Sequence, residues 1–457
     1  ATIEEIEITV TVTVPERGMQ KQIAVSLCVQ SDTPRQAEIC YFTVPTLSEN
    51  GKPSVYLQSR FFDGGIEIQN PCNKAVPGLS RLESDSGADV SYTVSRADFA
   101  AGIWNSDGAL PNPDPCAALV RCVQLPPHET QSLRFFLSFG HTEQSVRALR
   151  KLNLPPRTVP TENSIILESP DETLNTLFNA FLPNQIINGR LFARTGFYQS
   201  GGAYGFRDQL QDAACLLVTN AEFLRRQIFR CCAAQFEAGD VLHWWHPTLD
   251  RNGTVNGVRT RYSDDLLWLP FALAKYVLAT GDTAILDVQI AYLSADELGE
   301  NEKERYFDVP RGKNKGSVGE HAARAVRRAL RFGAHGLLLM GSGDWNDSFT
   351  GVGAKGKGES VWLSQFAVMV LESFGQMLKS VGKDSAFYFE TAAALRTAVE
   401  TYAWEGDRYL RAYYDDGEKM GSPQSAECKI DSLTQSFSVF ADLSPERRTT
   451  ALQTAYR

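Results

Sequence analysis

The stretch IEITVTVTV (Ile6–Val14) alternates apolar and polar side chains until Pro15 ends the run. Successive side chains of a β-strand point to opposite faces of a sheet, so this alternation predicts a strand with one apolar face. The pattern returns in Ile23–Val29 and in Leu133–Phe139, and clusters of turn-forming residues separate the runs. Short strands divided by such clusters are typical of antiparallel two-sheet domains. Residues 1–140 are therefore expected to form a large antiparallel β-sandwich.

The spacing of the apolar residues becomes helical after about residue 165. In Leu267–Leu278 they recur at i, i+4, i+7 and i+11, and Gly281 follows as a helix terminator. Trp362–Leu378 has the same kind of spacing. We expect a linker region with a helix at 141–165 and an all-α region at 166–457. Long loops between alternate helices indicate a helical barrel whose site lies in those loops.

The composition is that of a soluble globular protein, with 457 residues, 43% hydrophobic residues and a net charge of -9. Such a charge argues against nucleic acid or an anionic membrane as a partner. No apolar run approaches the roughly 20 residues of a membrane-spanning helix, and Ala1–Glu5 lacks the basic and apolar parts of a signal peptide. The nine cysteines show no metal-binding spacing, which favours reduced core thiols in a cytoplasmic protein.

The glycine-rich segment GSGDWND, Gly341–Asp347, groups side chains suited to a sugar. It presents the carboxylates Asp344 and Asp347 on either side of Trp345 and Asn346. A carboxylic acid can protonate a glycosidic oxygen, while an aromatic ring packs on the C–H face of the sugar. For these carboxylates taken alone, a turn or a helix cap is the alternative.

A second glycine-rich segment, Arg194–Asp212, ends in GFRDQLQD. Its glycines allow the backbone to turn tightly and to approach a ligand closely. Arg207 and Asp208 open the helix that follows, where a carboxylate can accept hydrogen bonds from sugar hydroxyls. A local ion pair between Arg207 and Asp212 is the equally weighted alternative.

The segment HWWHP, His243–Pro247, places two tryptophans side by side. Trp244 and Trp245 are interpreted as a sugar platform, with core packing as the alternative. The two histidines stand at i and i+3, and no third ligand has matching spacing, so we do not expect a metal site.

Three further segments favour structural roles. Either Ser263 or Asp264, in RTRYSDD, could cap the helix that follows. The segment Gly353–Gly358 lacks the GxxxxGK[ST] order and a preceding strand, so it is not expected to bind a nucleotide. The string CKIDSLTQS places a helix cap at Asp431 or Ser432.

Taken together, these strings resemble glycoside hydrolase family 94, the inverting sugar phosphorylases that include the cellobiose, cellodextrin and chitobiose enzymes. The strings GFRDQLQD, HWWHP, RTRYSDDLLWLP, GSGDWND and CKIDSLTQS follow one another within residues 160–440. The resemblance implies a β-sandwich, a linker helix and an (α/α)6 barrel. It also implies inorganic phosphate as co-substrate with no other cofactor, and a homodimer as the expected assembly.

By this resemblance Asp347 is the catalytic acid, Asp208 holds the sugar whose anomeric carbon is attacked, and Arg194 lies near the phosphate. The expected substrate-binding residues are Arg207, Asp208, Trp345, Asp344, Trp244, Trp245 and Asp265, with Asp344 a structural partner rather than a catalytic base. Phosphate is already an anionic nucleophile, so an inverting phosphorylase needs one carboxylic acid and no general base. The implied product is α-glucose 1-phosphate.

Three departures from the family pattern refine this interpretation. Gly202–Tyr204 stands where the cellobiose-type pattern has an extra arginine, which is similar to the β-1,2-glucan branch of the family. Ser348–Thr350 replaces the usual Gly-Met after GDWND. The family's glutamate-glycine segment with its phosphate-binding histidine is not found before Arg457. We therefore expect the chain to be a fragment, with an unfinished barrel and an incomplete phosphate site.

The leading hypothesis is inverting phosphorolysis of β-linked glucooligosaccharides, with β-1,2-glucan as the expected substrate. A phosphorylase of the cellobiose, cellodextrin or chitobiose type is the nearest alternative. An inverting hydrolase would need a second carboxylate about 6.5–9.5 Å from the acid, for which Asp264 or Asp265 is the candidate. A non-catalytic, glucan-binding region of a larger synthase is the third hypothesis.

Overall fold

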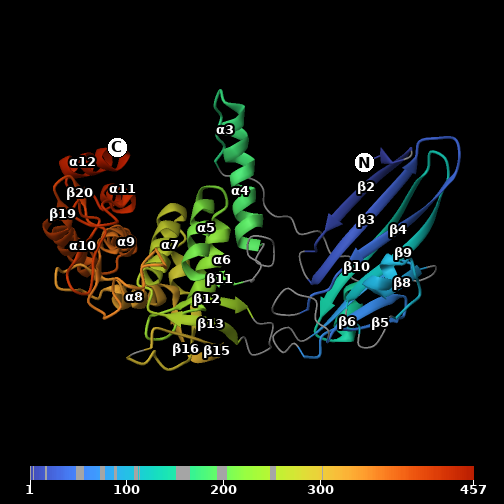
Figure 1. Cartoon of the computed structure of the whole chain (residues 1–457), viewed down its shortest axis with the longest axis horizontal. Helices are drawn as coiled ribbons and strands as arrows, with labels where there is room; N and C mark the ends of the chain where they lie inside the picture. The colour runs from blue at the N-terminus through green and yellow to red at the C-terminus, as the bar shows by residue number, and fades with distance from the viewer. Residues whose placement is uncertain are drawn as a thin grey trace. The chain divides into compact units, whose positions relative to one another are not determined.

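A computed structural model of the chain shows two compact units, Ala1–Thr161 and Glu162–Arg457, which are described separately (Figure 1). The residues that the structure describes are 2–3, 5–15, 18–47, 56–72, 78–86, 90–107, 112, 114–150, 165–192, 203–247, 254–300 and 302–457. Part of the predicted linker, residues 151–164, lies outside these ranges, as does Arg194.

The first unit consists of two antiparallel sheets. The larger has the strand order β1-β2-β3-β10-β7-β6-β5, and the smaller has the order β4-β9-β8. The strands are β1 (Thr2–Ile3), β2 (Ile6–Thr13), β3 (Met19–Val29), β4 (Arg35–Thr43), β5 (Gln58–Phe62), β6 (Gly65–Gln69), β7 (Leu79–Ser84), β8 (Val90–Ser95), β9 (Pro115–Leu125) and β10 (Thr130–Gly140). The described residues of this unit also form the short helices α1 (Arg96–Ala100) and α2 (Glu143–Arg150).

One apolar core joins the two sheets of this unit. Leu27 of β3, Ile66 of β6 and Phe135 of β10 meet Leu119 of β9 in the same buried cluster. Antiparallel strands that bury one face against a second sheet produce this alternation of buried and exposed side chains. The strands predicted from Ile6, Ile23 and Leu133 are confirmed.

The apolar face of β2 is only partly covered. Ile6 and Ile8 pack against the core, whereas Val10 and Val12 are exposed. The alternation in the sequence predicts the strand correctly. It does not predict which of its apolar side chains are buried, because their burial depends on segments far away in the chain.

The second unit is mainly helical. Its helices are α3 (Glu172–Thr176), α4 (Leu182–Asn184), α5 (Phe206–Cys215), α6 (Ala221–Cys232), α7 (Asp265–Thr280), α8 (Val318–Ala329), α9 (Val361–Ser380), α10 (Ala386–Ala398), α11 (Ser432–Phe440) and α12 (Pro445–Tyr456). Short 3-10 and π-helical turns extend several of them: η1 (Leu177–Phe181), η2 (Gln185–Phe192), η4 (Leu216–Val218), η5 (Thr283–Asp287) and η6 (Val399–Ala403).

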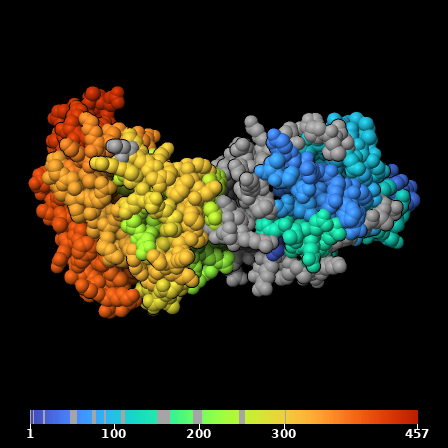
Figure 2. Space-filling view, turned by 90° about the horizontal axis from the view of Figure 1, so that it is seen from below, coloured from blue at the N-terminus to red at the C-terminus, as the bar shows by residue number. Residues whose placement is uncertain are grey.

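Helix α7 packs against α5, α6, α8 and α9, and α9 packs in turn against α10 and α11, so successive helices lie side by side. Figure 1 shows this series running from green to red. The space-filling view shows green, yellow and orange segments adjoining on one face of the unit (Figure 2), as expected where connections between different helices meet.

Short strands in the connections form small sheets beside the helices. One has the order β11-β12-β13-β15, and another has the order β17-β18-β21-β22. The first comprises β11 (Tyr204–Gly205), β12 (Leu242–Pro247), β13 (Val255–Thr260) and β15 (Glu304–Val309), and the second comprises β17 (Leu338–Leu339), β18 (Glu359–Ser360), β21 (Ala412–Tyr413) and β22 (Lys419–Met420). Two pairs complete the set: β14 (Gln289–Leu293) with β16 (Arg311–Ser317), and β19 (Trp404–Glu405) with β20 (Arg408–Tyr409).

The two long helices expected from the sequence are confirmed. Helix α7 ends at Thr280, and Gly281 follows with φ 70°, the left-handed conformation that terminates a helix. Helix α9, 20 residues long, is apolar enough to cross a membrane by length and composition, so the expectation that no apolar run approaches that length is wrong. Its most apolar window is 72% buried inside the unit, as in the core helix of a globular protein.

All nine cysteines are free, but the expectation that they are core thiols holds only for some of them. Cys116, Cys231 and Cys232 are buried, whereas Cys40 and Cys215 are exposed despite their apolar surroundings in the sequence. Burial raises the pKa of the Cys231 thiol to about 12, so this thiol stays protonated and unreactive at neutral pH.

The glycine-rich loop Gly353–Gly358 binds an anion that the chain itself supplies. The Asp415 carboxylate accepts hydrogen bonds from the backbone N–H groups of Lys355 (2.8 Å), Lys357 (2.8 Å) and Gly358 (2.9 Å). Burial opposes the ionisation of Asp415, but these donors outweigh it, and the pKa of Asp415 is lowered. The loop is therefore occupied by a side chain.

Replacing Asp415 with asparagine is expected to destabilise the helical unit at pH 7 by about 1–2 kcal/mol, because three hydrogen bonds to a charged acceptor are weakened. A lowered pKa stabilises the fold above the unfolded-state pKa, near 3.9, and this stabilisation is lost as the pH falls through the folded-state value. Urea unfolding should therefore separate the variant from the wild type at pH 7, and the difference should shrink as the pH falls below about 3.9. The neighbouring exposed Asp416→Asn is the control, and an equal effect there would contradict this role for Asp415.

Candidate active site

The site is built where the loop before α7 joins the segment Gly341–Asp347, hereafter the acid loop. Ser342 N–H donates to the Arg261 carbonyl at 3.0 Å, and Ser263 N–H donates to the Gly343 carbonyl at 3.0 Å. Gly341 has φ 66°, and a Cβ atom there would lie 2.2 Å from the Arg261 carbonyl oxygen. Only glycine allows this approach, which places Asp347 beside the first turn of α7.

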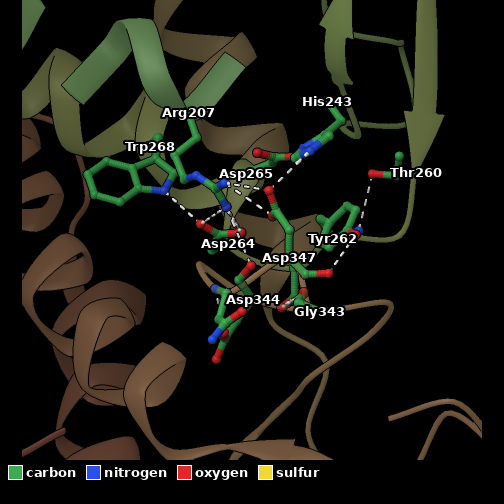
Figure 3. A network of polar contacts seen from close by, with 12 residues as sticks. Arg207, His243, Thr260, Tyr262, Asp264, Asp265, Trp268, Gly343, Asp344 and Asp347 are labelled. Carbon is green, nitrogen blue, oxygen red and sulfur yellow. Dashed lines mark hydrogen bonds and ion pairs between the residues drawn. The ribbon is translucent and has the colours of Figure 1, made fainter. Parts of the chain in front are cut away.

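Arg207 of α5 joins these segments at the centre of the site (Figure 3). Its Nη2 lies 3.1 Å from each carboxylate oxygen of Asp347, and its Nη1 lies 3.2 Å from Oδ2 of Asp264. Nη1 also contacts the Asp344 carbonyl oxygen at 3.4 Å. Burial alone would lower the pKa of Arg207, but Asp264 and the neighbouring carboxylates raise it, so the guanidinium keeps its charge.

Asp347 combines a fixed carboxylate with access to solvent. Its side chain is 49% exposed, and the Tyr262 hydroxyl donates to its backbone carbonyl at 3.1 Å. Arg207 therefore holds the carboxyl group from the protein side while the opposite side stays open, the arrangement that proton transfer to a bound ligand requires.

Asp264 lies beneath this pair. It is fully buried and accepts hydrogen bonds from Arg207 and from Nε1 of Trp268, the latter at 3.0 Å. Burial, followed by the nearby Asp265 carboxylate, raises the pKa of Asp264 above its ordinary value, and Arg207 opposes this shift. Asp264 occupies the N-cap position of α7, but its side chain makes no capping bond. Its carboxylate anchors Arg207 instead.

His243 of β12 completes the polar network. Its Nδ1 lies 2.7 Å from Oδ2 of Asp265, and its Nε2 lies 3.9 Å from Oδ2 of Asp347. The imidazole stacks on the ring of Tyr262, with 4.5 Å between ring centroids. Strand β12, helix α7 and the acid loop thus each contribute one polar side chain to this network: His243, Asp265 and Asp347.

A second, buried network holds the start of the acid loop. Arg411 donates to both carboxylate oxygens of Asp344, at 2.6 and 2.7 Å, and the Ser360 hydroxyl donates to Asp344 at 2.5 Å. Arg411 also pairs with Asp431 at 3.1 Å. Asp344 and Arg411 are both fully buried, so this network positions the loop from inside.

Comparison with known proteins places this site in a family. The family model described as "Glycosyl hydrolase 94 superfamily, catalytic domain" matches residues 161–457 of this chain. These residues include every member of the two networks. The chain belongs to the glycosyl hydrolase 94 superfamily. The prediction of family 94 from the sequence is therefore confirmed.

Relatives within family 94 are sugar-active enzymes. The chain is 32% identical over 472 residues to cyclic beta-(1,2)-glucan synthase NdvB of Rhizobium meliloti, covering 96% of this chain and 16% of that protein. It is 32% identical over 299 residues to solabiose phosphorylase of Paenibacillus borealis, covering 65% of this chain and 34% of that enzyme. N,N'-diacetylchitobiose phosphorylase of Vibrio proteolyticus is 29% identical over 310 residues, covering 62% of this chain and 36% of that enzyme. The chain thus spans well under half the length of each of these relatives.

Among solved structures, a bacterial glucoamylase complexed with acarbose aligns with 90% of this chain and 57% of its own, at 10% identity and a TM-score of 0.43. A similarity of this size is too low to define the fold.

Three of the substrate contacts predicted for this family 94 chain are buried and bound to other side chains of the protein. Asp344 is held by Arg411, Asp265 faces His243, and Trp245 is 3% exposed and stacked on Tyr204. The contacts of these three residues with a sugar stay predictions. For Trp245 the structure shows the alternative, core packing. The Asp344 carboxylate also accepts a hydrogen bond from the Asn346 N–H at 3.1 Å, which is the turn named as the alternative role for this loop.

Of the other predicted contacts, Arg207 is buried against Asp264 and Asp347, and the remaining three lie at or near the surface of the site. Trp345 is 46% exposed, Trp244 is half-buried against Tyr306, and Asp208 lies half-buried on the first turn of α5 beside Arg207. Their contacts with a sugar remain predictions, and the phosphate role of Arg194 falls outside the described residues.

Two smaller alternatives are resolved. Asp212 pairs with Arg190 at 3.0 Å rather than with Arg207, so the expected local ion pair is wrong. Asp431 caps α11 by accepting from the Leu433 N–H at 2.8 Å, as expected for a structural role. Among the described residues no group of three His, Cys, Asp or Glu could hold a metal ion.

Sequence reasoning missed the contacts that bring several residues into the two networks, among them His243, Tyr262, Asp264, Trp268 and Arg411, although Asp264 was considered as a helix cap or a hydrolase base. The first four lie within the strings that carry the family resemblance, so their positions were visible but their partners were not. Arg411 stands in no motif, and no local pattern of the sequence distinguishes it from any other arginine.

Proposed function

We propose that this chain carries the catalytic centre for inverting phosphorolysis of β-linked glucooligosaccharides, with β-1,2-glucan as substrate and α-glucose 1-phosphate as product. The observation that carries the proposal is Asp347, an exposed carboxyl group held by Arg207 within a family 94 domain. In phosphorolysis Asp347 gives its proton to the leaving glycosidic oxygen, while phosphate attacks the anomeric carbon from the opposite face.

The names of the relatives support a phosphorylase and a β-1,2 linkage. Two of the enzymes compared above are named as phosphorylases, and the relative that aligns with 96% of the chain is named as a cyclic beta-(1,2)-glucan synthase. The substitution of Gly202–Tyr204 for the cellobiose-type arginine is in accord with the same branch. The β-1,2 linkage of the substrate and the (α/α)6 barrel architecture of the domain are both parts of this proposal.

The environment of the candidate bases argues against an inverting hydrolase. A hydrolase needs a second carboxylate about 6.5–9.5 Å from the acid, with space for the water that it activates. Asp264 is fully buried and bound to Arg207 and Trp268, and Asp265 is buried and bound to His243. Both carboxylates are buried and held by side chains of the protein, so a nucleophile that needs no base is favoured.

The proposal extends to the remaining components of the reaction. Inorganic phosphate is the co-substrate, Arg194 is its proposed ligand, and no other cofactor takes part. Trp345, Trp244 and Asp208 are the proposed contacts to the sugar. A homodimer in the cytoplasm is the proposed setting.

Incubating the protein with β-1,2-, β-1,4- and N-acetylated oligosaccharides, with and without phosphate, tests the proposal. We expect α-glucose 1-phosphate from the β-1,2 substrate only when phosphate is present. Reducing sugar released without phosphate would establish a hydrolase instead. Binding of glucan without any turnover would establish the non-catalytic hypothesis.

A further inference from the structure

His243 is the histidine of the site, and its imidazole has a carboxyl group on each side. It lies between two carboxylates, Asp265 at 2.7 Å from Nδ1 and Asp347 at 3.9 Å from Nε2. The side chain is 13% exposed and is stacked on Tyr262. A ring fixed on one side by a buried carboxylate has a defined orientation, so Nε2 faces the proposed acid (Figure 3).

We propose that His243, as an imidazolium, is a positioning residue for Asp347: its Nε2–H and the Arg207 guanidinium hold the Asp347 carboxylate between them. This inference rests on the proposed function, in which Asp347 transfers the proton. It concerns the charged form of Asp347, which takes the proton of the attacking hydroxyl when the reaction runs from α-glucose 1-phosphate toward oligosaccharide.

The geometry assigns each contact a distinct role. Asp265 is buried, its Oδ1 has no hydrogen-bond partner among the described residues, and its Oδ2 contacts His243. Asp347 is held from two directions, by Arg207 at 3.1 Å and by His243 at 3.9 Å. Two cations on different elements restrict a carboxyl group that one contact would leave free to rotate.

The charge of the imidazole follows from the groups that face it. The carboxyl groups of Asp265 on α7 and Asp347 in the acid loop, the Arg207 guanidinium on α5 and the Tyr262 ring face the imidazole. Burial lowers the pKa of His243, and the Arg207 charge lowers it further. The carboxylates of Asp265 and, to a smaller extent, Asp347 have the larger combined effect and raise the pKa to about 9. A raised pKa stabilises the fold below the ordinary value of 6.5, and this contribution is lost as the pH rises through about 9.

Two substitutions separate the contacts of His243. In His243→Asn the amide can still donate to Asp265 from the position of Nδ1 but cannot reach Asp347. In His243→Gln a neutral donor stands near the position of Nε2. We expect His243→Asn to lower kcat for synthesis about 10- to 100-fold with little change in KM, since a misplaced catalytic group costs rate rather than binding. His243→Gln should recover part of that rate.

The pH profile distinguishes positioning from a merely structural role. For synthesis from α-glucose 1-phosphate, the wild type should lose kcat/KM as the pH rises through about 9, and neither variant should show this alkaline limb. His335→Asn is the matched control, because His335 also bonds a buried carboxylate, Glu359 at 2.5 Å, and stacks on a tyrosine, Tyr413 at 4.0 Å. It should leave the profile unchanged. A wild-type rate and profile in both His243 variants would overturn the proposal.

A measurement that needs no turnover separates this inference from the proposed function. In protein labelled with 15N-histidine, the imidazole titration of His243 is assigned by its absence from His243→Asn. Removing the negative charge in Asp347→Asn should lower the pKa of His243 by about 1, since an opposite charge within about 4–6 Å favours the imidazolium. An unchanged pKa would overturn the proposal even in an active enzyme. Conversely, if the pKa of His243 shifts but the wild-type protein has no phosphorolysis activity, the contact between His243 and Asp347 is supported and the proposed function is rejected.

Discussion

Asp347→Asn is expected to lower kcat for phosphorolysis by about 1,000-fold or more, because a positioned general acid accounts for roughly 100- to 10,000-fold of a rate and asparagine has no proton to give. Binding of oligosaccharide should change little, since the amide has the same shape as the carboxyl group. Glucose 1-phosphate formation under saturating substrate and phosphate, with calorimetric titration of the oligosaccharide, measures the two quantities separately.

The matched control for this variant is Asp287→Asn, an exposed aspartate at the end of η5 in the same unit. It should retain the wild-type kcat. If Asp347→Asn kept more than about one tenth of the wild-type rate, general acid catalysis by this residue would be excluded. If both variants lost activity together with their thermal transition, the loss would report unfolding rather than chemistry.

Arg411→Met is expected to cause the largest loss of stability, about 3–5 kcal/mol in the free energy of unfolding, because it leaves the buried Asp344 carboxylate without its partner. Both side chains are fully buried, and two hydrogen bonds of 2.6 and 2.7 Å join them. Asp344 begins the turn that leads to Asp347, so the variant should also lose activity at temperatures where it remains folded.

Denaturant unfolding followed by tryptophan fluorescence measures this effect, since six of the seven tryptophans, all but Trp104, lie in the helical unit. The control is Arg448→Met, which breaks an exposed pair with Asp442 and should cost less than about 1 kcal/mol. The double variant Arg411→Met/Asp344→Asn should be less destabilised than the sum of the single variants, because it removes the unpaired charge. Additive effects, or a loss below about 1 kcal/mol in Arg411→Met, would contradict this role of the pair.

The local elements of the fold were predictable because each follows from residues close together in the chain. The alternation in Ile6–Val14 and the helical spacing in Leu267–Leu278 depend on neighbours within a few positions. Gly281 as a helix terminator and Asp431 as a cap belong to the same class of signal. The apolar length of α9 was missed because serine, glutamine and glutamate interrupt it, although its average over the helix is high.

The roles of the carboxylates were not predictable in the same way. Asp344 and Asp347 stand three residues apart in one motif, yet one is buried against Arg411 and the other is half exposed beside Arg207. Asp264 and Asp265 are adjacent, yet one binds Arg207 and the other binds His243. In each pair the difference arises from the partner, which lies on another element.

The strand and helix runs described under sequence analysis, the family and the motif that holds the proposed acid all follow from local periodicity or from short strings. Which carboxylate meets solvent, and which meets an arginine or a histidine, depends on the tertiary structure. Arg207 and Asp347 are 140 residues apart in the chain, and their contact depends on the close approach of two loops at Gly341. Burial and charge pairing are properties of that meeting, and no spacing along the chain encodes them.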